Sequence, residues 1–131
     1  MRAAFLIPET TVHANGQGPV LDLTLPVPAS ILLTLGITQA VEQESLALDI
    51  FGSADGESWA DTPLLSIPQK FYAGVSSLLL NLTARPDLRF LRADWKVNRW
   101  GRGSMTPLFG LYLFAEPVGV PVTTPSSPTA G

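Results

Sequence analysis

The fold class follows most directly from Gly52-Ser53-Ala54-Asp55-Gly56-Glu57-Ser58-Trp59, a polar turn that closes the alternating run 45–51. An Asp-Gly pair supplies the positive φ that a tight chain reversal requires. Further along, residues 89–97 alternate again, so that Leu91 and Ala93 share one strand face while Arg92, Asp94 and Lys96 share the other. The two runs predict antiparallel β-structure in which one face of the second strand is dry and the other carries charge.

Proline and glycine punctuate the whole chain, with twelve and eleven copies, and the segments between them are short. This spacing leaves little room for long helices and favours strands. We predict strands over residues 20–25, 30–38, 45–51, 64–67, 78–82, 89–97 and 108–116. Seven or eight short strands with frequent turns are typical of an all-β, two-sheet antiparallel β-sandwich, either jelly-roll or immunoglobulin-like.

Two of these segments carry further expectations. The run Ser30–Thr38 is apolar at nearly every position, which predicts a central strand that is covered on both sides or lies at a subunit contact. The alternative for this region is an amphipathic helix over Ser30–Glu44, which Gly36 weakens. Prolines flank residues 64–67, so that strand is expected at a sheet edge.

The length of 131 residues suits a single domain with one core. We expect the β-sandwich to occupy residues 1–116, and residues 117–131, rich in proline, serine and threonine, to form an extended arm. A loose tail is the alternative for that segment. The composition, 46% hydrophobic and 15% charged, is more apolar than average, which suggests that some apolar surface is kept for a neighbour.

Several classes of protein are disfavoured by simple features of the chain. The sequence contains no cysteine, which excludes disulfides, thiolate metal sites and cysteine nucleophiles. Residues 1–7 resemble the start of a secretion signal, but Pro8 ends their apolar run too early, so we expect cytoplasmic synthesis without a signal peptide. No segment approaches the roughly 20 apolar residues of a membrane-spanning helix, and we expect no membrane association.

Charge is divided between two parts of the chain. Residues 85–102 hold six basic and two acidic residues, residues 42–61 hold six acids and no lysine or arginine, and the net charge is −3. One interpretation is that the basic strand docks on an acidic surface, such as the acidic segment of another copy. The other is that the two strands are neighbours in one sheet and pair their charges across it. The candidate partner-binding residues are Arg89, Arg92, Lys96, Arg99, Trp100, Arg102, Glu42, Glu44, Glu57 and Asp61.

Catalytic and nucleic-acid functions have little support. His13 is the only histidine and lies in a polar, glycine-containing segment, where a surface residue is a better interpretation than a general base. A loop could hold calcium with Asp55, Glu57 and Asp61, but acids in turns usually serve the turn itself, so we expect no metal and no cofactor. Bases could stack on Trp100, yet a net charge of −3 argues against nucleic acid as the partner.

A further pattern is the order of parts along residues 5–116, which runs from a short leading strand and the loop Asn15–Gly18 through the turn quoted above to the 89–95 run and a closing strand over Phe109–Phe114. In this order the chain resembles small β-sandwich proteins encoded among bacteriophage and prophage structural genes. The Gly-Ser-x-Asp-Gly-x-x-Trp turn and the Arg-Phe-Leu-Arg strand are also similar to discoidin-type carbohydrate- or lipid-binding domains, although the cysteine pair of many such domains is absent. Both resemblances imply binding or assembly, and neither implies catalysis.

We therefore predict a non-enzymatic structural protein that self-associates or decorates a larger protein assembly. The first resemblance implies a virion or a filament as that assembly. The alternative is a carbohydrate-binding module, in which Trp59, Tyr72 and Trp100 would form an exposed aromatic platform.

Overall fold

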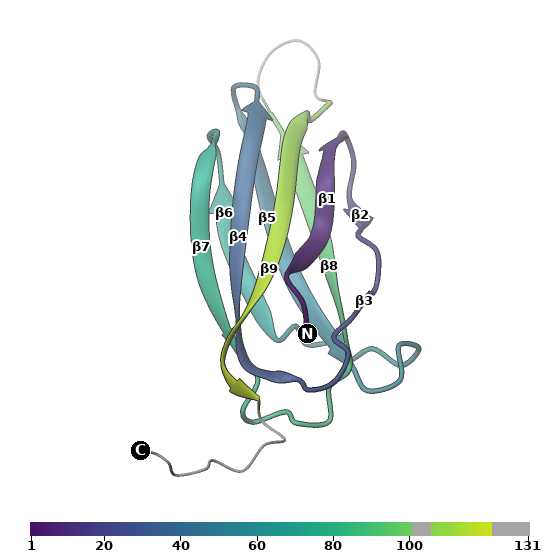
Figure 1. The fold of residues 1–131 in the computed structure, drawn as a ribbon. Coiled ribbons are helices and arrows are strands. Elements are labelled where there is room, and N and C mark those ends of the chain that lie inside the picture. Colours follow the sequence, from purple (N-terminus) through teal and green to yellow (C-terminus); the bar gives the residue numbers. More distant parts are fainter. Residues whose placement is uncertain (101–105, 122–131) are drawn as a thin grey trace.

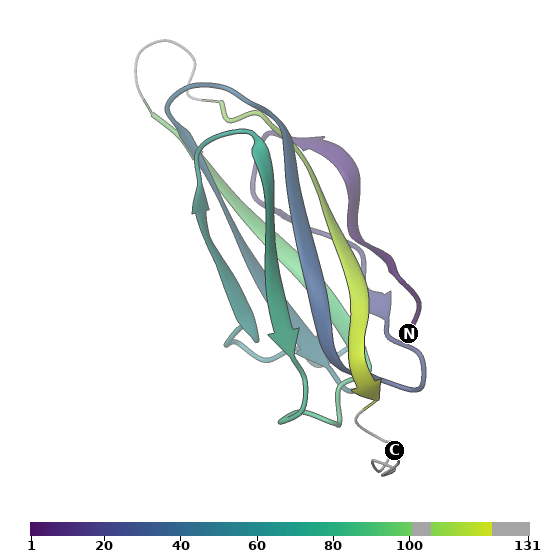
Figure 2. The ribbon, with the colours of Figure 1, turned by 60° about the vertical axis from the view of Figure 1, so that its left-hand side comes forward.

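A computed structural model describes residues 1–100 and 106–121 of the chain. Over these residues it is all-β, with two antiparallel sheets packed face to face (Figures 1 and 2). The strands are β1 (Ala4–Val12), β2 (Gly16–Gln17), β3 (Leu21–Asp22), β4 (Pro28–Ala40), β5 (Glu44–Ser53), β6 (Leu65–Lys70), β7 (Gly74–Asn81), β8 (Phe90–Arg99) and β9 (Phe109–Pro121). The predicted β-sandwich is confirmed.

The strand order identifies the sandwich type. One sheet has four strands in the order β1-β9-β4-β7, and the other has the order β2-β8-β5-β6, with β3 also paired to β8. The two-residue strands β2 and β3 act as one interrupted strand because both pair with β8. Counted in this way, eight strands form two four-stranded layers with the strand order of a jelly roll, one of the two sandwich types expected.

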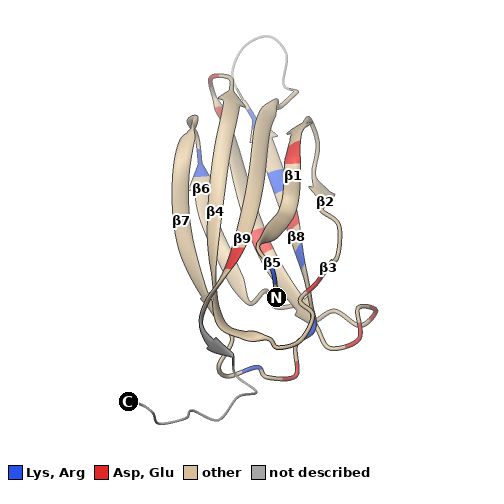
Figure 3. Cartoon of the chain, in the orientation of Figure 1, with Lys and Arg blue, Asp and Glu red and all other residues tan. Residues whose placement is uncertain are grey.

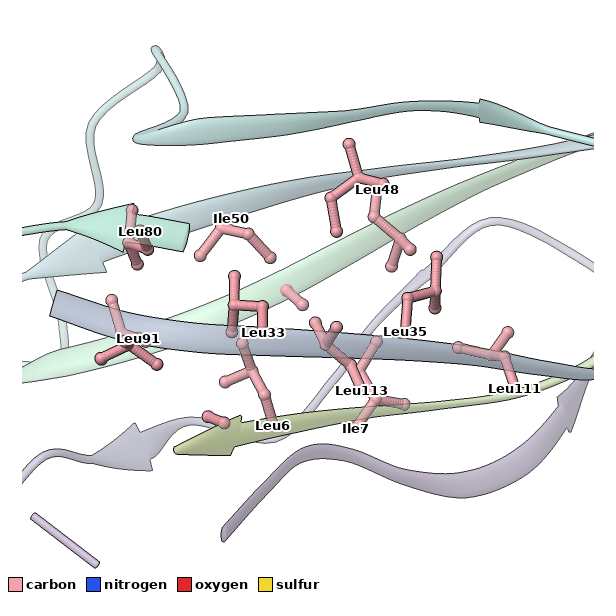
Figure 4. Packing of buried hydrophobic residues seen from close by; sticks show 14 of the residues in the cluster. Leu6, Ile7, Leu33, Leu35, Leu48, Ile50, Leu80, Leu91, Leu111 and Leu113 are labelled. Atoms are coloured by element: carbon pink, nitrogen blue, oxygen red, sulfur yellow. The ribbon is translucent and has the colours of Figure 1, made fainter. Parts of the chain in front are cut away.

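The core lies between the two sheets and is built from alternate residues of each strand (Figure 4). In β4 the inward residues are Ile31, Leu33, Leu35 and Ile37, all of them buried, and Leu111 and Leu113 of β9 lie beside them. The five-stranded sheet contributes Leu46, Leu48 and Ile50 from β5 and Leu91 and Ala93 from β8. The predicted dry face of residues 89–97 is therefore confirmed for Leu91 and Ala93.

Strand β4 is central, as expected, but only one of its faces is buried in the core. Leu32 and Thr34, which point away from the core, are half-buried. The helical alternative for residues 30–44 is wrong, because β4 pairs with β7 on one side and β9 on the other over this region. Extended backbone is favoured here because both neighbours supply ladder hydrogen bonds.

Several strand boundaries differ from expectation, and β7, for example, begins at Gly74 and not at residue 78. The strand expected over residues 20–25 is reduced to Leu21–Asp22, because Thr24 has a positive φ of 53° that breaks the extended chain. Strand β6 is at a sheet edge, as expected, but it continues through Pro68, where a shift in its register with β5 accommodates the proline. Strand β9 runs to Pro121, past its expected end at residue 116. The remainder of the expected arm, residues 122–131, lies outside the described residues.

Candidate interaction surfaces

The acidic and basic strands are neighbours in one sheet. Strand β5 pairs with β8 along its whole length, with Ala47 opposite Lys96. The Nζ atom of Lys96 lies 4.0 Å from Oδ2 of Asp49 on the neighbouring strand. Figure 3 shows both basic and acidic positions along β8. The expectation that the two strands pair charge within one sheet is confirmed at this position.

Arg92 is engaged inside the molecule rather than presented to a partner. Its Nε and Nη2 atoms donate to the two carboxylate oxygens of Asp94, at 2.8 and 3.2 Å. Its guanidinium lies 4.7 Å from the ring centre of Trp59 and 5.5 Å from that of Phe51. With only 16% of its side chain exposed, Arg92 pairs with a carboxylate and stacks on aromatic rings at once.

The other predicted basic residues differ in their hydrogen bonds and in their exposure to solvent. Arg89 donates to the carbonyl oxygens of Pro86 and Leu88, and Arg99 donates to that of Thr106. Lys96 is 72% exposed. Arg102 lies outside the described residues. Among the predicted basic residues that the structure describes, Lys96 is therefore the most exposed.

Glu44 corrects the predicted acidic surface. Its side chain is buried, at 1% exposure, so it is not available to a partner. Its carboxylate accepts hydrogen bonds from the backbone N–H of Val41 at 2.7 Å and of Leu108 at 2.8 Å. These bonds tie the β4–β5 turn to the segment that leads into β9. The other predicted acids, Glu42, Glu57 and Asp61, are exposed.

The acidic turn after β5 is held by its own side chains. Oδ1 of Asp55 accepts from the backbone N–H of Ser58 and Glu57, each at 2.8 Å, and from the hydroxyl of Ser53 at 2.9 Å. These bonds, led by the one from Ser58, lower the pKa of Asp55 to about 2. Gly56 has the positive φ, 80°, that the sequence predicts. Among the described residues no group of three potential ligands is arranged to hold a metal ion.

A hollow of about 360 Å³ lies beside this turn and is lined by Asp55, Trp59, Arg85 and Asp87 among others. Arg85 and Asp87 pair with each other at 3.1 Å. Because these charged groups already pair within the molecule, we interpret the hollow as a gap between loops and not as a binding site. His13 lies elsewhere, exposed as expected, with Nδ1 3.2 Å from the carbonyl oxygen of Pro107.

The predicted aromatic platform is brought together only in part. Trp59 stacks on Arg92, whereas Tyr72 and Trp100 gather around Phe71, whose ring centre lies 6.4 Å from Tyr72 and 6.3 Å from Trp100. We call Phe71, Tyr72 and Trp100 the aromatic cluster. All three are exposed, Tyr72 by 82%. Phe71 is the member that the sequence did not indicate, because its place beside Trp100 depends on β6 and β8 ending on the same side of the five-stranded sheet.

The outer face of the four-stranded sheet is a second candidate surface, of which the sequence predicted only the strand over residues 30–38 as a possible subunit contact. Strands β4 and β7 contain no charged residue, and β9 contains only Glu116 (Figure 3). Val75 and Leu79 of β7 are 68% and 56% exposed, and Leu79 lies opposite Leu32 of β4. We call this surface, formed by the outward side chains of β1, β9, β4 and β7, the apolar face.

Aromatic rings cover the middle of the apolar face. Phe5 of β1 packs against Phe114 and Tyr112 of β9, with ring centres 4.9 and 6.1 Å away. The ring of Tyr112 lies directly over Gly36 of β4, so close that a Cβ atom there would lie 2.1 Å from the ring. Glycine at position 36 thus lets a ring lie flat on the sheet. Toward β7 no aromatic ring takes over this role, and Val75 and Leu79 stay exposed.

The described part of the chain contains no helix long and apolar enough to cross a membrane. A scan against family models and a search of curated proteins both return no match. The resemblances to phage-type and discoidin-type proteins therefore stay predictions.

Proposed function

We propose that this protein is a non-enzymatic assembly module that associates with copies of itself or decorates a larger protein assembly. The observation that carries the proposal is the apolar face, on which Val75, Leu79 and Phe5 are each about half exposed or more. Exposed apolar side chains gathered on one sheet face are characteristic of protein contact sites, since covering them removes apolar area from water at about 25 cal/mol per Å².

The charge arrangement supports an apolar contact rather than an electrostatic one. The conspicuous charges of β5 and β8 are paired within the molecule, as in Arg92 with Asp94 and Asp49 with Lys96. Exposed charge would also keep copies of a chain with a net charge of −3 apart, whereas the apolar face carries almost none. The jelly-roll fold does not decide the matter, because it hosts both capsid and lectin domains.

The experiment is light scattering behind size-exclusion chromatography over a range of protein concentrations, followed by negative-stain imaging. We expect the mass to rise above that of one chain, and the increase to persist at 1 M salt because screening does not weaken apolar contacts. Leu79→Glu, on the apolar face, should lower the mass. Gln69→Glu, which adds the same charge at an exposed position of β6 in the other sheet, is the matched control. A single-chain mass at every concentration would refute self-association and leave only attachment to a different protein assembly.

A second candidate, carbohydrate binding, is favoured by the aromatic cluster. Exposed aromatic rings can stack on the apolar faces of sugar rings, and Tyr72 and Trp100 offer such rings around Phe71. A glycan array probed with the native protein and with Trp100→Ala tests this candidate. Carbohydrate binding is supported if a glycan binds the native protein but not Trp100→Ala. The control Trp59→Ala, which removes the ring stacked on Arg92, should still bind that glycan.

A further inference from the structure

The four sheet edges are not protected equally. Strand β1 contains Pro8 and Glu9 and has two shifts in its register with β9. Strand β6 contains Pro68 and Lys70 and has one register shift with β5. Strands β2 and β3, on the remaining edge, are two residues long each. Prolines, charges, bulges and very short strands are the devices by which proteins prevent another chain from pairing with an edge.

Strand β7 has none of these devices. It is eight residues long, contains neither proline nor a charged residue, and pairs with β4 from Gly74 to Asn81 without a register shift (Figure 1). Alternate residues of an edge strand turn their N–H and C=O groups away from the sheet, where water binds them until another strand pairs with them. The far side of β7 is therefore open to the addition of a strand.

We infer that β7 pairs antiparallel with β7 of a second copy about a two-fold axis at Ser77, an inference that rests on the proposed function and names its partner. The two four-stranded sheets then form one continuous sheet. Directly opposite residues of an antiparallel pair point to the same face of the sheet, and alternate residues of one strand share a face. The cores of both copies therefore lie on the same side of the joined sheet only if the numbers of paired residues differ by an even amount. With the axis at Ser77, each Val75 lies opposite Leu79 of the other copy.

A second copy suits this edge better than a different chain because the edge is complementary to itself. The two most exposed apolar residues of β7, Val75 and Leu79, cover each other twice in this arrangement. No like charges meet, since residues 71–84 contain none. An axis one residue further along, at Leu78, would place Val75 opposite Asn81 and Leu79 opposite Ser77, so it matches apolar with polar groups.

The arrangement also fixes how far the pairing can extend. A two-fold contact uses the same patch on both copies and closes on itself. Strand β6, which flanks β7 in the other layer, cannot extend the five-stranded sheet because Pro68 and the register shift interrupt its edge. The β7 contact therefore yields a dimer, and any larger assembly must use other parts of the apolar face.

The absence of native cysteine allows a direct test on the whole chain. Ser77→Cys places one thiol of each copy at the axis, within the distance that a disulfide spans. Thr10→Cys, exposed on β1 at the other edge of the same sheet, is the matched control. With oxidised glutathione, we expect Ser77→Cys to form a covalent dimer at least tenfold faster than Thr10→Cys. Equal rates would overturn the inference.

Mixed cysteine variants test the direction and register. Val75→Cys and Leu79→Cys should cross-link when mixed, whereas Val75→Cys alone should not, because antiparallel pairing carries its two thiols far apart. Cross-linking of Val75→Cys with itself would overturn the antiparallel arrangement.

A disruptive variant separates this inference from the proposed function. Ser77→Lys places two ammonium groups together at the axis and should reduce the dimer to single chains, whereas Thr10→Lys should not. Far-ultraviolet circular dichroism checks that both variants keep the fold. If the native chain assembles but Ser77→Lys assembles equally well, the inference fails and the proposed function stands. If the native chain stays a monomer, the inference fails together with self-association, the half of the proposed function on which it rests.

Discussion

Replacing Glu44 by alanine should destabilise the fold of the single chain. Its carboxylate is buried and accepts two backbone hydrogen bonds, from Val41 at 2.7 Å and Leu108 at 2.8 Å. Alanine leaves both N–H groups without this acceptor. A buried donor without a partner costs about 1–3 kcal/mol, and because Val41 and Leu108 are only half-buried we take about 1–2 kcal/mol each. The expected loss is therefore about 2–4 kcal/mol of the free energy of unfolding.

Urea denaturation followed by tryptophan fluorescence measures this loss. A domain of this size has a urea slope of about 1–3 kcal/mol per M, and at a slope of about 2 the midpoint should fall by roughly 1–2 M with the slope unchanged. Glu44→Gln keeps one carbonyl oxygen as an acceptor and should lose about half as much. The matched control is Glu42→Ala, two residues away and exposed, which should stay within about 0.5 kcal/mol of the native chain.

The outcome separates two roles for the same carboxylate. A docking residue would change assembly and leave the stability of the single chain intact. Equal midpoints for Glu44→Ala and Glu42→Ala would refute the structural role, and the hydrogen bonds to Val41 and Leu108 would then contribute little.

Three further outcomes are expected. Gly36→Ala should lower the free energy of unfolding in urea by about 1–3 kcal/mol because its Cβ would collide with the ring of Tyr112. In a Tyr112→Ala background the same methyl should cost much less, and an undiminished cost would contradict this packing. Because the pKa of Asp55 is lowered, its hydrogen bonds stabilise the turn at any pH above the ordinary pKa of about 4 and are lost as the pH falls through about 2. NMR of the carboxyl group should show a titration midpoint near 2, whereas an open turn would give a midpoint near 4. Lys96→Glu should leave assembly unchanged in light scattering because Lys96 is exposed on the five-stranded sheet, and dissociation of the assembly would instead revive electrostatic docking.

Local patterns in the sequence predicted most of the fold. The alternation around Leu48 and Leu91 depends only on neighbouring residues, so it gave the core faces of β5 and β8 correctly. The Asp55-Gly56 turn was equally local. Where a strand ends is set by less visible causes, such as the positive φ of Thr24 or the pairing of Pro28 with Pro121, which extends β9.

The candidate site was harder to predict because burial and partners depend on distant segments. Glu44 reads as a surface acid among other acids, yet one of its hydrogen-bond donors is Leu108, 64 residues away. Arg92 reads as a free cation, yet its stacking on Trp59 depends on where the turn after β5 folds back. Nothing in the neighbourhood of either residue in the sequence signals these contacts.

The strand order decides which strands can meet a partner, and it favours β7 over the more highly charged β8. Strand β8 draws attention through its charges, but it lies between β5 and the short strands β2 and β3, so its backbone is paired on both sides. Strand β7 contains no charged or aromatic residue, and a strand without charge is ordinary in the centre of a sheet. Only the strand order makes that lack significant, because it places β7 at an edge. An interaction that depends on an uncharged edge should respond to a lysine at Ser77 and not to salt.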